Sequence, residues 1–118
     1  MDYIAFQYYQ EGNNASANIL FEEFITGGNE TEDVRFFLGL SYLYSNKSID
    51  AISHFEWILN RKETSYKDAA TWFIALALTD SDRYNEAKRY LIEVSNLDQN
   101  KGKRELAKKA KTLLDALD

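Results

Sequence analysis

One pattern of small and bulky residues occurs three times along this chain of 118 residues. The three copies begin at residues 4, 38 and 74 and read IAFQYYQEGNNASANILFEEF, LGLSYLYSNKSIDAISHFEWI and IALALTDSDRYNEAKRYLIEV. Each copy has an alanine near its middle (Ala17, Ala51, Ala87), and a bulky apolar residue stands four positions later (Phe21, Phe55, Leu91). A period of this length predicts a stack of similar supersecondary units, each of which buries its apolar face against the next.

The units are expected to be helical. The chain contains no proline, so nothing in it removes a backbone donor from a helix interior. Short polar segments rich in Gly, Asn, Ser and Asp separate the apolar-periodic stretches and are typical of helix ends. The periodicity predicts helices over residues 2–11, 14–27, 31–45, 48–61, 65–79, 83–97 and 102–117.

The order of small and large residues resembles the signature of the tetratricopeptide repeat (TPR) family. The middle copy carries it best, with Leu38, Gly39, Tyr42, Ala51 and Phe55. Three departures are evident: the first signature aromatic is replaced by Arg35 and Thr71, the terminal proline is absent, and the third copy has Ala75 and Leu78 for Gly and Tyr. The resemblance implies a single all-α domain over residues 1–118. It would be an α-solenoid of three TPR-like helix-turn-helix repeats, over about 1–28, 31–62 and 65–98.

The last segment predicts a capping helix over about 102–117. It places one apolar stripe opposite a basic face, and the end of a solenoid needs such a helix to cover its last apolar surface. The stripe consists of Leu106, Ala110, Leu113 and Leu117, and the basic face of Arg104, Lys108 and Lys111. A solvated face is the preferred interpretation of these cations, and a patch for an acidic partner is the alternative.

Nothing in the sequence points to catalysis, a cofactor or a metal site. The chain has one histidine and no cysteine, and it lacks the glycine loops and serine motifs of common enzymes. His54 is expected to be a surface residue. Asp80 and Asp82 resemble a calcium loop only faintly, and helix capping is the better interpretation of both.

Charge and hydropathy limit the classes of partner that the chain is expected to bind. Residues 1–60 hold nine acidic and two basic side chains, which argues against nucleic acid on that half. No apolar stretch is long enough to suggest insertion in a membrane. By alignment Met1 falls three positions into the first helix of its repeat. This favours a chain excised from a longer protein, with a short first helix as the alternative.

The first helix of each repeat carries more apolar residues than fit on the one stripe that packs within the repeat. The segments RFFLGLSYLY and TWFIALAL are apolar nearly all round, so they must be covered on more than one side. By resemblance to the family, the second stripe lines a concave groove that binds peptides or partner helices. This predicts a groove formed by Phe6, Tyr9, Phe36, Leu40, Leu43, Trp72 and Leu76.

The chain is therefore expected to be a non-catalytic protein-protein interaction module. The polar residues that grip a peptide carboxylate in one TPR subset are replaced here by Asp2, Phe6, Phe37, Ala69 and Phe73, which argues against that mode. Three occupants of the second stripe remain open: an apolar or aromatic peptide, a second protomer or neighbouring repeats, and the core between repeats. The second alternative would make the chain part of a longer solenoid or a homo-oligomer.

Overall fold

The computed structural model describes residues 3–97 and 102–118, and every regular element in that part of the chain is an α-helix. The helices are α1 (Tyr3–Gln10), α2 (Asn14–Thr26), α3 (Glu32–Tyr44), α4 (Ser48–Leu59), α5 (Lys67–Asp80), α6 (Tyr84–Ser95) and α7 (Arg104–Leu117). The predicted helices agree with these bounds to within two residues at each end. Expectations that involve Met1, Asp2 or residue 98 lie outside the described residues.

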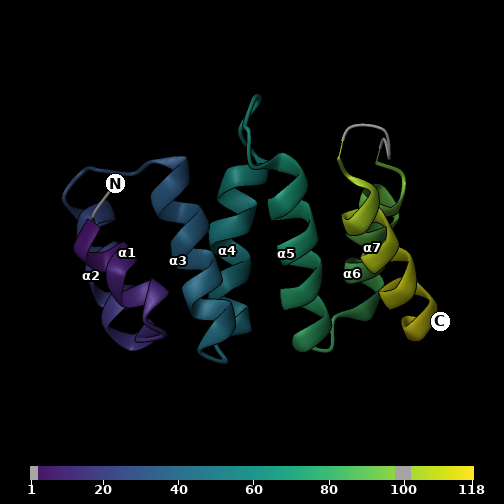
Figure 1. The fold of residues 1–118 in the computed structure, drawn as a ribbon, viewed down its shortest axis with the longest axis horizontal. Coiled ribbons are helices and arrows are strands. Elements are labelled where there is room, and N and C mark those ends of the chain that lie inside the picture. The colour runs from purple at the N-terminus through teal and green to yellow at the C-terminus, as the bar shows by residue number, and fades with distance from the viewer. Residues whose placement is uncertain (1–2, 98–101) are drawn as a thin grey trace.

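The helices form a row in chain order (Figure 1). Each helix packs against the next one along the chain, and α1 also contacts α3, as α3 contacts α5. The molecule is accordingly elongated, with extents of 40 × 28 × 25 Å. Contacts between alternate helices mean that α3, in the middle of the row, has neighbours on both of its long sides.

The alanines and bulky residues of the repeated pattern are the packing points of this row. Ala17, Ala51 and Ala87 are fully buried, and so are the residues four positions later, Phe21, Phe55 and Leu91. The tightest approach is at Gly39 on α3, where an added Cβ would lie 2.7 Å from Cε1 of Phe55 on α4. Because that distance is shorter than carbon atoms tolerate, a larger residue at this position would have to displace the fully buried Phe55 ring.

Two turn residues act as the helix caps that the polar segments predict. Asn13 Oδ1 accepts from the Ser16 backbone N–H at 3.3 Å, and Thr31 Oγ1 accepts from the Val34 N–H at 3.3 Å. The expectation that Asp80 and Asp82 act as caps is wrong. Asp80 accepts from the Ser48 hydroxyl at the start of α4, and Asp82 accepts from the Tyr84 hydroxyl at 2.8 Å.

The predicted apolar stripe of α7 packs as expected. Ala107 and Ala110 are fully buried, and Ala110 belongs to a core cluster with Ala75, Leu91 and Val94. The leucines of the stripe pack against that cluster, while Arg104, Lys108 and Lys111 on the opposite face are exposed. The seventh helix therefore covers the apolar face of the α5–α6 pair.

Candidate functional site: a groove between α5 and α7

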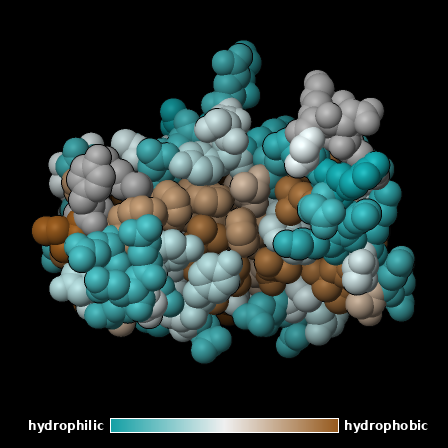
Figure 2. Space-filling view, in the orientation of Figure 1, coloured by the Kyte–Doolittle hydropathy of each residue, from teal (hydrophilic) through white to brown (hydrophobic). Residues whose placement is uncertain are grey.

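A groove of about 480 Å³ lies between α5 and α7. Trp72 and Leu76 line it from α5, and α7 contributes the residues Lys108, Lys109, Thr112, Leu113 and Ala116. Figure 2 shows that apolar side chains gather over the middle of the face that contains α3 and α5, between hydrophilic side chains over α1 and α7. The groove lies where this apolar surface meets the basic helix.

The structure brings together only two of the seven predicted groove residues, Trp72 and Leu76, in this groove. Phe6 and Tyr9 lie further along the row and contact Phe37 on α3, with ring centroids 4.8 and 5.5 Å apart. Leu43 is partly buried against the central core cluster. These three residues have part of their surface exposed, but they are separated from the α5–α7 groove.

Phe36 and Leu40 are buried in the core and do not form a groove wall. Their side chains are 7% and 5% exposed. The Phe36 ring stacks on Tyr66 at a centroid distance of 4.5 Å and meets Phe73 edge-on at 5.9 Å. Of the three occupants left open by the sequence, the core between repeats is therefore the correct one at these two positions.

Phe36 is buried and Trp72 is partly exposed because different elements lie beside them in the row of helices. The two residues are 36 positions apart and equivalent in the repeat. The next repeat, which consists of α5 and α6, lies beside α3. Its Phe73 and the preceding Tyr66 pack against Phe36. α7 packs on α6 and contributes the other wall of the groove that Trp72 lines.

The charge at the groove comes from α7. Lys108 and Lys109 line it, and neither forms an ion pair within residues 3–97 and 102–118. Two other cations near α7 are paired: Lys103 with Asp68 at 3.0 Å, and Lys88 with Asp118 at 3.0 Å. The groove thus combines an apolar wall from α5 with two uncompensated positive charges from α7.

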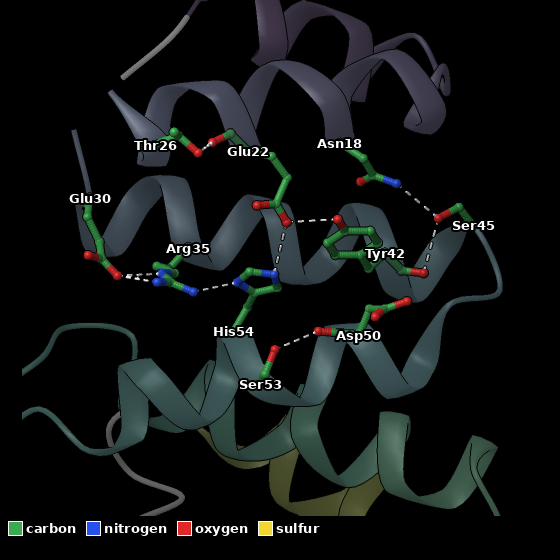
Figure 3. Close-up of polar contacts among 10 residues, drawn as sticks. All are labelled: Asn18, Glu22, Thr26, Glu30, Arg35, Tyr42, Ser45, Asp50, Ser53 and His54. Carbon is green, nitrogen blue, oxygen red and sulfur yellow. Dashed lines mark hydrogen bonds and ion pairs between the residues drawn. The ribbon is translucent and has the colours of Figure 1, made fainter. Parts of the chain in front are cut away.

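A second polar feature, which sequence reasoning missed, joins α2, α3 and α4 (Figure 3). His54 is only 7% exposed, so the expectation of a surface residue is wrong. Its ring lies parallel to that of Tyr42, with centroids 5.4 Å apart, and its Nε2 faces Glu22 Oε1 at 3.6 Å. The same Glu22 oxygen accepts from the Tyr42 hydroxyl at 2.8 Å. The ring lies where Tyr42 of α3 and Glu22 of α2 meet α4.

Arg35 completes this polar cluster and explains one departure from the family pattern. Its guanidinium bonds to Glu30, approaches His54 Nδ1 at 2.9 Å and lies 5.2 Å from the Trp57 ring centroid. A flat cation stacked on an aromatic ring therefore stands where the signature has an aromatic. No pattern in one sequence would reveal this, because the contacts join α3 to α4 and to Glu30 in the loop before α3.

The hydrogen bonds determine the charge state of His54. Arginine can only donate, so Nδ1 accepts and the proton of the neutral ring is on Nε2, facing Glu22. Burial lowers the pKa of His54, the Arg35 cation lowers it further, and Glu22 acts in the opposite direction more weakly. Glu22 in turn raises the pKa of Tyr42, after the larger effect of burial. These groups join α2, α3 and α4 through polar contacts.

We expect the free energy of unfolding to fall as the pH drops below about 6.5, the ordinary histidine pKa. The folded-state pKa of His54 is lowered, so in this range the unfolded chain binds the proton more readily and gains stability. One proton limits the slope to about 1.4 kcal/mol per pH unit. Urea unfolding between pH 5.5 and 7.5 measures it.

The matched control is His54→Gln, which cannot titrate and keeps an amide donor for Glu22. Since the chain has one histidine, this variant should lose the dependence in that pH range. An equal pH dependence in both proteins would contradict the assignment of His54.

A larger hollow of about 710 Å³ lies beside the polar cluster, lined by residues of α2 and by Tyr42 and Lys47. Its walls mix opposite charges, with Glu22, Glu23 and Lys47 among them. The Tyr42 hydroxyl and His54 already bind one Glu22 oxygen. Its lining lacks the combination of one charge sign with a continuous apolar wall that the α5–α7 groove has.

Other kinds of site receive no support from the described residues. In residues 3–97 and 102–118, no three His, Cys, Asp or Glu side chains are grouped as metal ligands would be. None of the helices in this part of the chain has the length and apolar character needed to cross a bilayer. No protein-family model matches the sequence, and a comparison with curated proteins found no match.

Proposed function

We propose that this chain is a non-catalytic protein-protein interaction module of TPR-like architecture that binds a peptide segment in the groove between α5 and α7. The observation that carries the proposal is the placement of Trp72 and Leu76 on an open groove instead of in the core. Aromatic residues in such positions supply a large share of binding energy at protein interfaces.

The TPR-like solenoid is supported by three features. The helices pack in sequence, alternate helices α1, α3 and α5 touch, and the repeated alanines occupy the packing points. In such an array the first helices of successive repeats share one face, and binding segments lie along it. The apolar area over α3 and α5 in Figure 2 fits that arrangement.

The groove is large enough to bind a few side chains of a partner but too small to hold a whole domain. Its volume of about 480 Å³ lies in the range of roughly 300–1,000 Å³ typical of ligand pockets. A few large side chains of an extended or helical peptide would fill it. A larger partner would engage the groove through a protruding segment of this kind.

The test uses peptides selected from a displayed random library against the immobilised 118-residue chain. A selected peptide should bind Trp72→Ala and Leu76→Ala at least about tenfold more weakly than the unchanged protein, since each substitution removes an apolar anchor. Affinity is measured by fluorescence anisotropy, with helicity checked by circular dichroism.

The control is Ile49→Ala, which removes an apolar side chain that is 73% exposed and lies outside the groove. It should bind the peptide as the unchanged chain does. Peptides that bind all four proteins equally, or a failure to select any peptide, would contradict the proposed function.

A further inference from the structure

We infer that the segment bound in the α5–α7 groove is an acidic amphipathic one, with apolar side chains on the Trp72–Leu76 wall and carboxylates beside Lys108 and Lys109. This inference rests on the proposed function and adds the chemical class of the partner. Its basis is charge complementarity at a groove whose two walls differ in character.

The apolar half of the recognition comes from α5 and from one side of α7. Trp72 and Leu113 line the groove and also pack against the core cluster of Ala75, Leu91, Val94 and Ala110. Their positions are therefore fixed by packing, and part of each side chain still faces the groove. A partner has to present apolar side chains here to gain from removing that surface from water.

The charged half comes from Lys108 and Lys109, which are both exposed. The acidic groups nearest in chain order on α7, Glu105 and Asp115, make no ion pair with either lysine. Thr112, which also lines the groove, is neutral, and its hydroxyl donates to the Lys108 carbonyl oxygen at 3.0 Å. Carboxylates of a partner would meet two cations that make no ion pair with any described residue.

A basic or neutral partner fits less well. A basic segment would place like charges against Lys108 and Lys109, and such contacts are unfavourable at an interface. A purely apolar segment would leave both lysine side chains at its edge without a favourable charge interaction. Residues 61–118, which include the groove, hold twelve basic and ten acidic side chains, so this half of the chain has a positive balance of two.

The test combines a charge reversal with a control on the same helix. The double variant Lys108→Glu/Lys109→Glu changes two exposed groove residues, whereas Lys111→Glu changes an exposed lysine of α7 that does not line the groove. Library peptides are selected separately against the unchanged chain and against the double variant. Association rates are then measured at low and high salt.

Peptides selected on the unchanged chain should be enriched in Asp and Glu beside apolar residues, and those selected on the double variant in Lys and Arg. The acidic peptides should associate with the double variant about tenfold more slowly at low salt, and the difference should shrink at 1 M salt, where the screening length is about 3 Å. The Lys111→Glu protein should behave nearly as the unchanged chain does.

The outcomes separate the inference from the proposed function. Selected peptides without acidic enrichment, whose binding depends on Trp72 but not on the lysines, would overturn the inference and leave the proposed function standing. Peptides indifferent to both Trp72 and the lysines would overturn both. A concentration-dependent dimer of the chain alone that Trp72→Ala abolishes would assign the groove to a second copy and also overturn the inference.

Discussion

Removal of residues 102–118 is expected to lower the free energy of unfolding by about 5 kcal/mol or more and to promote aggregation. The deletion uncovers Leu91 and Val94, which are at most 1% exposed in the intact chain. It also removes the leucines of α7 that pack on them. Each large apolar side chain contributes about 1.5–3 kcal/mol when buried, and a domain has only about 5–15 kcal/mol in total. Urea unfolding followed by circular dichroism, with light scattering for aggregation, measures both effects.

A pair of neighbouring substitutions controls for the loss of chain length. Ala110→Asp places a charge at a fully buried position of α7, whereas Lys111→Asp places it on the exposed face. The first should reproduce much of the destabilisation and the second very little. Equal unfolding midpoints for the truncated and intact chains would refute the capping role of α7.

Replacing Phe36 with Ala is expected to lower the free energy of unfolding by about 3–5 kcal/mol, the usual cost of deleting a buried aromatic ring. The ring is 7% exposed and contacts Phe37, Phe55, Tyr66 and Phe73, which come from α3, α4, α5 and the loop before it. Its loss leaves a cavity between two repeats. Chemical denaturation of the purified variant gives the value.

Trp72→Ala is the natural comparison, because the two residues are equivalent in the repeat. It should cost less stability than Phe36→Ala, since part of the indole faces the groove, and it should weaken peptide binding directly. A loss of less than about 1 kcal/mol for Phe36→Ala would instead show that this ring is accessible to a partner.

The packing of each repeat could be predicted from the sequence because it depends on residues close together in the chain. An alanine followed four residues later by a bulky residue brings both onto one helix face, and the turns fix which helix they meet. Gly39 is the clearest case, because its need for close approach is visible both in the pattern and in the structure, where an added Cβ would lie 2.7 Å from the Phe55 ring.

The sequence could not predict which residues of the second apolar stripe are buried, because their burial depends on the elements that lie beside each repeat. Phe36 and Trp72 have the same place in the pattern, but the aromatic rings of α5 and its preceding loop cover one, and a gap before α7 exposes the other. The prediction that His54 is a surface residue was wrong for a related reason. Its burial comes from Glu22 and Arg35, which belong to other helices, and one sequence gives no sign of that pairing.

The most direct test of the account uses the two indole N–H signals of the chain in a two-dimensional NMR titration with a selected peptide. Trp72 lines the groove, whereas Trp57 does not line it and has the guanidinium groups of Arg35 and Arg61 at 5.2 and 4.8 Å from its ring centroid. Trp57 is therefore an internal control. We expect the Trp72 signal to shift and saturate with the binding curve while the Trp57 signal stays in place. Saturating peptide that leaves the Trp72 signal unmoved would contradict binding in the groove between α5 and α7.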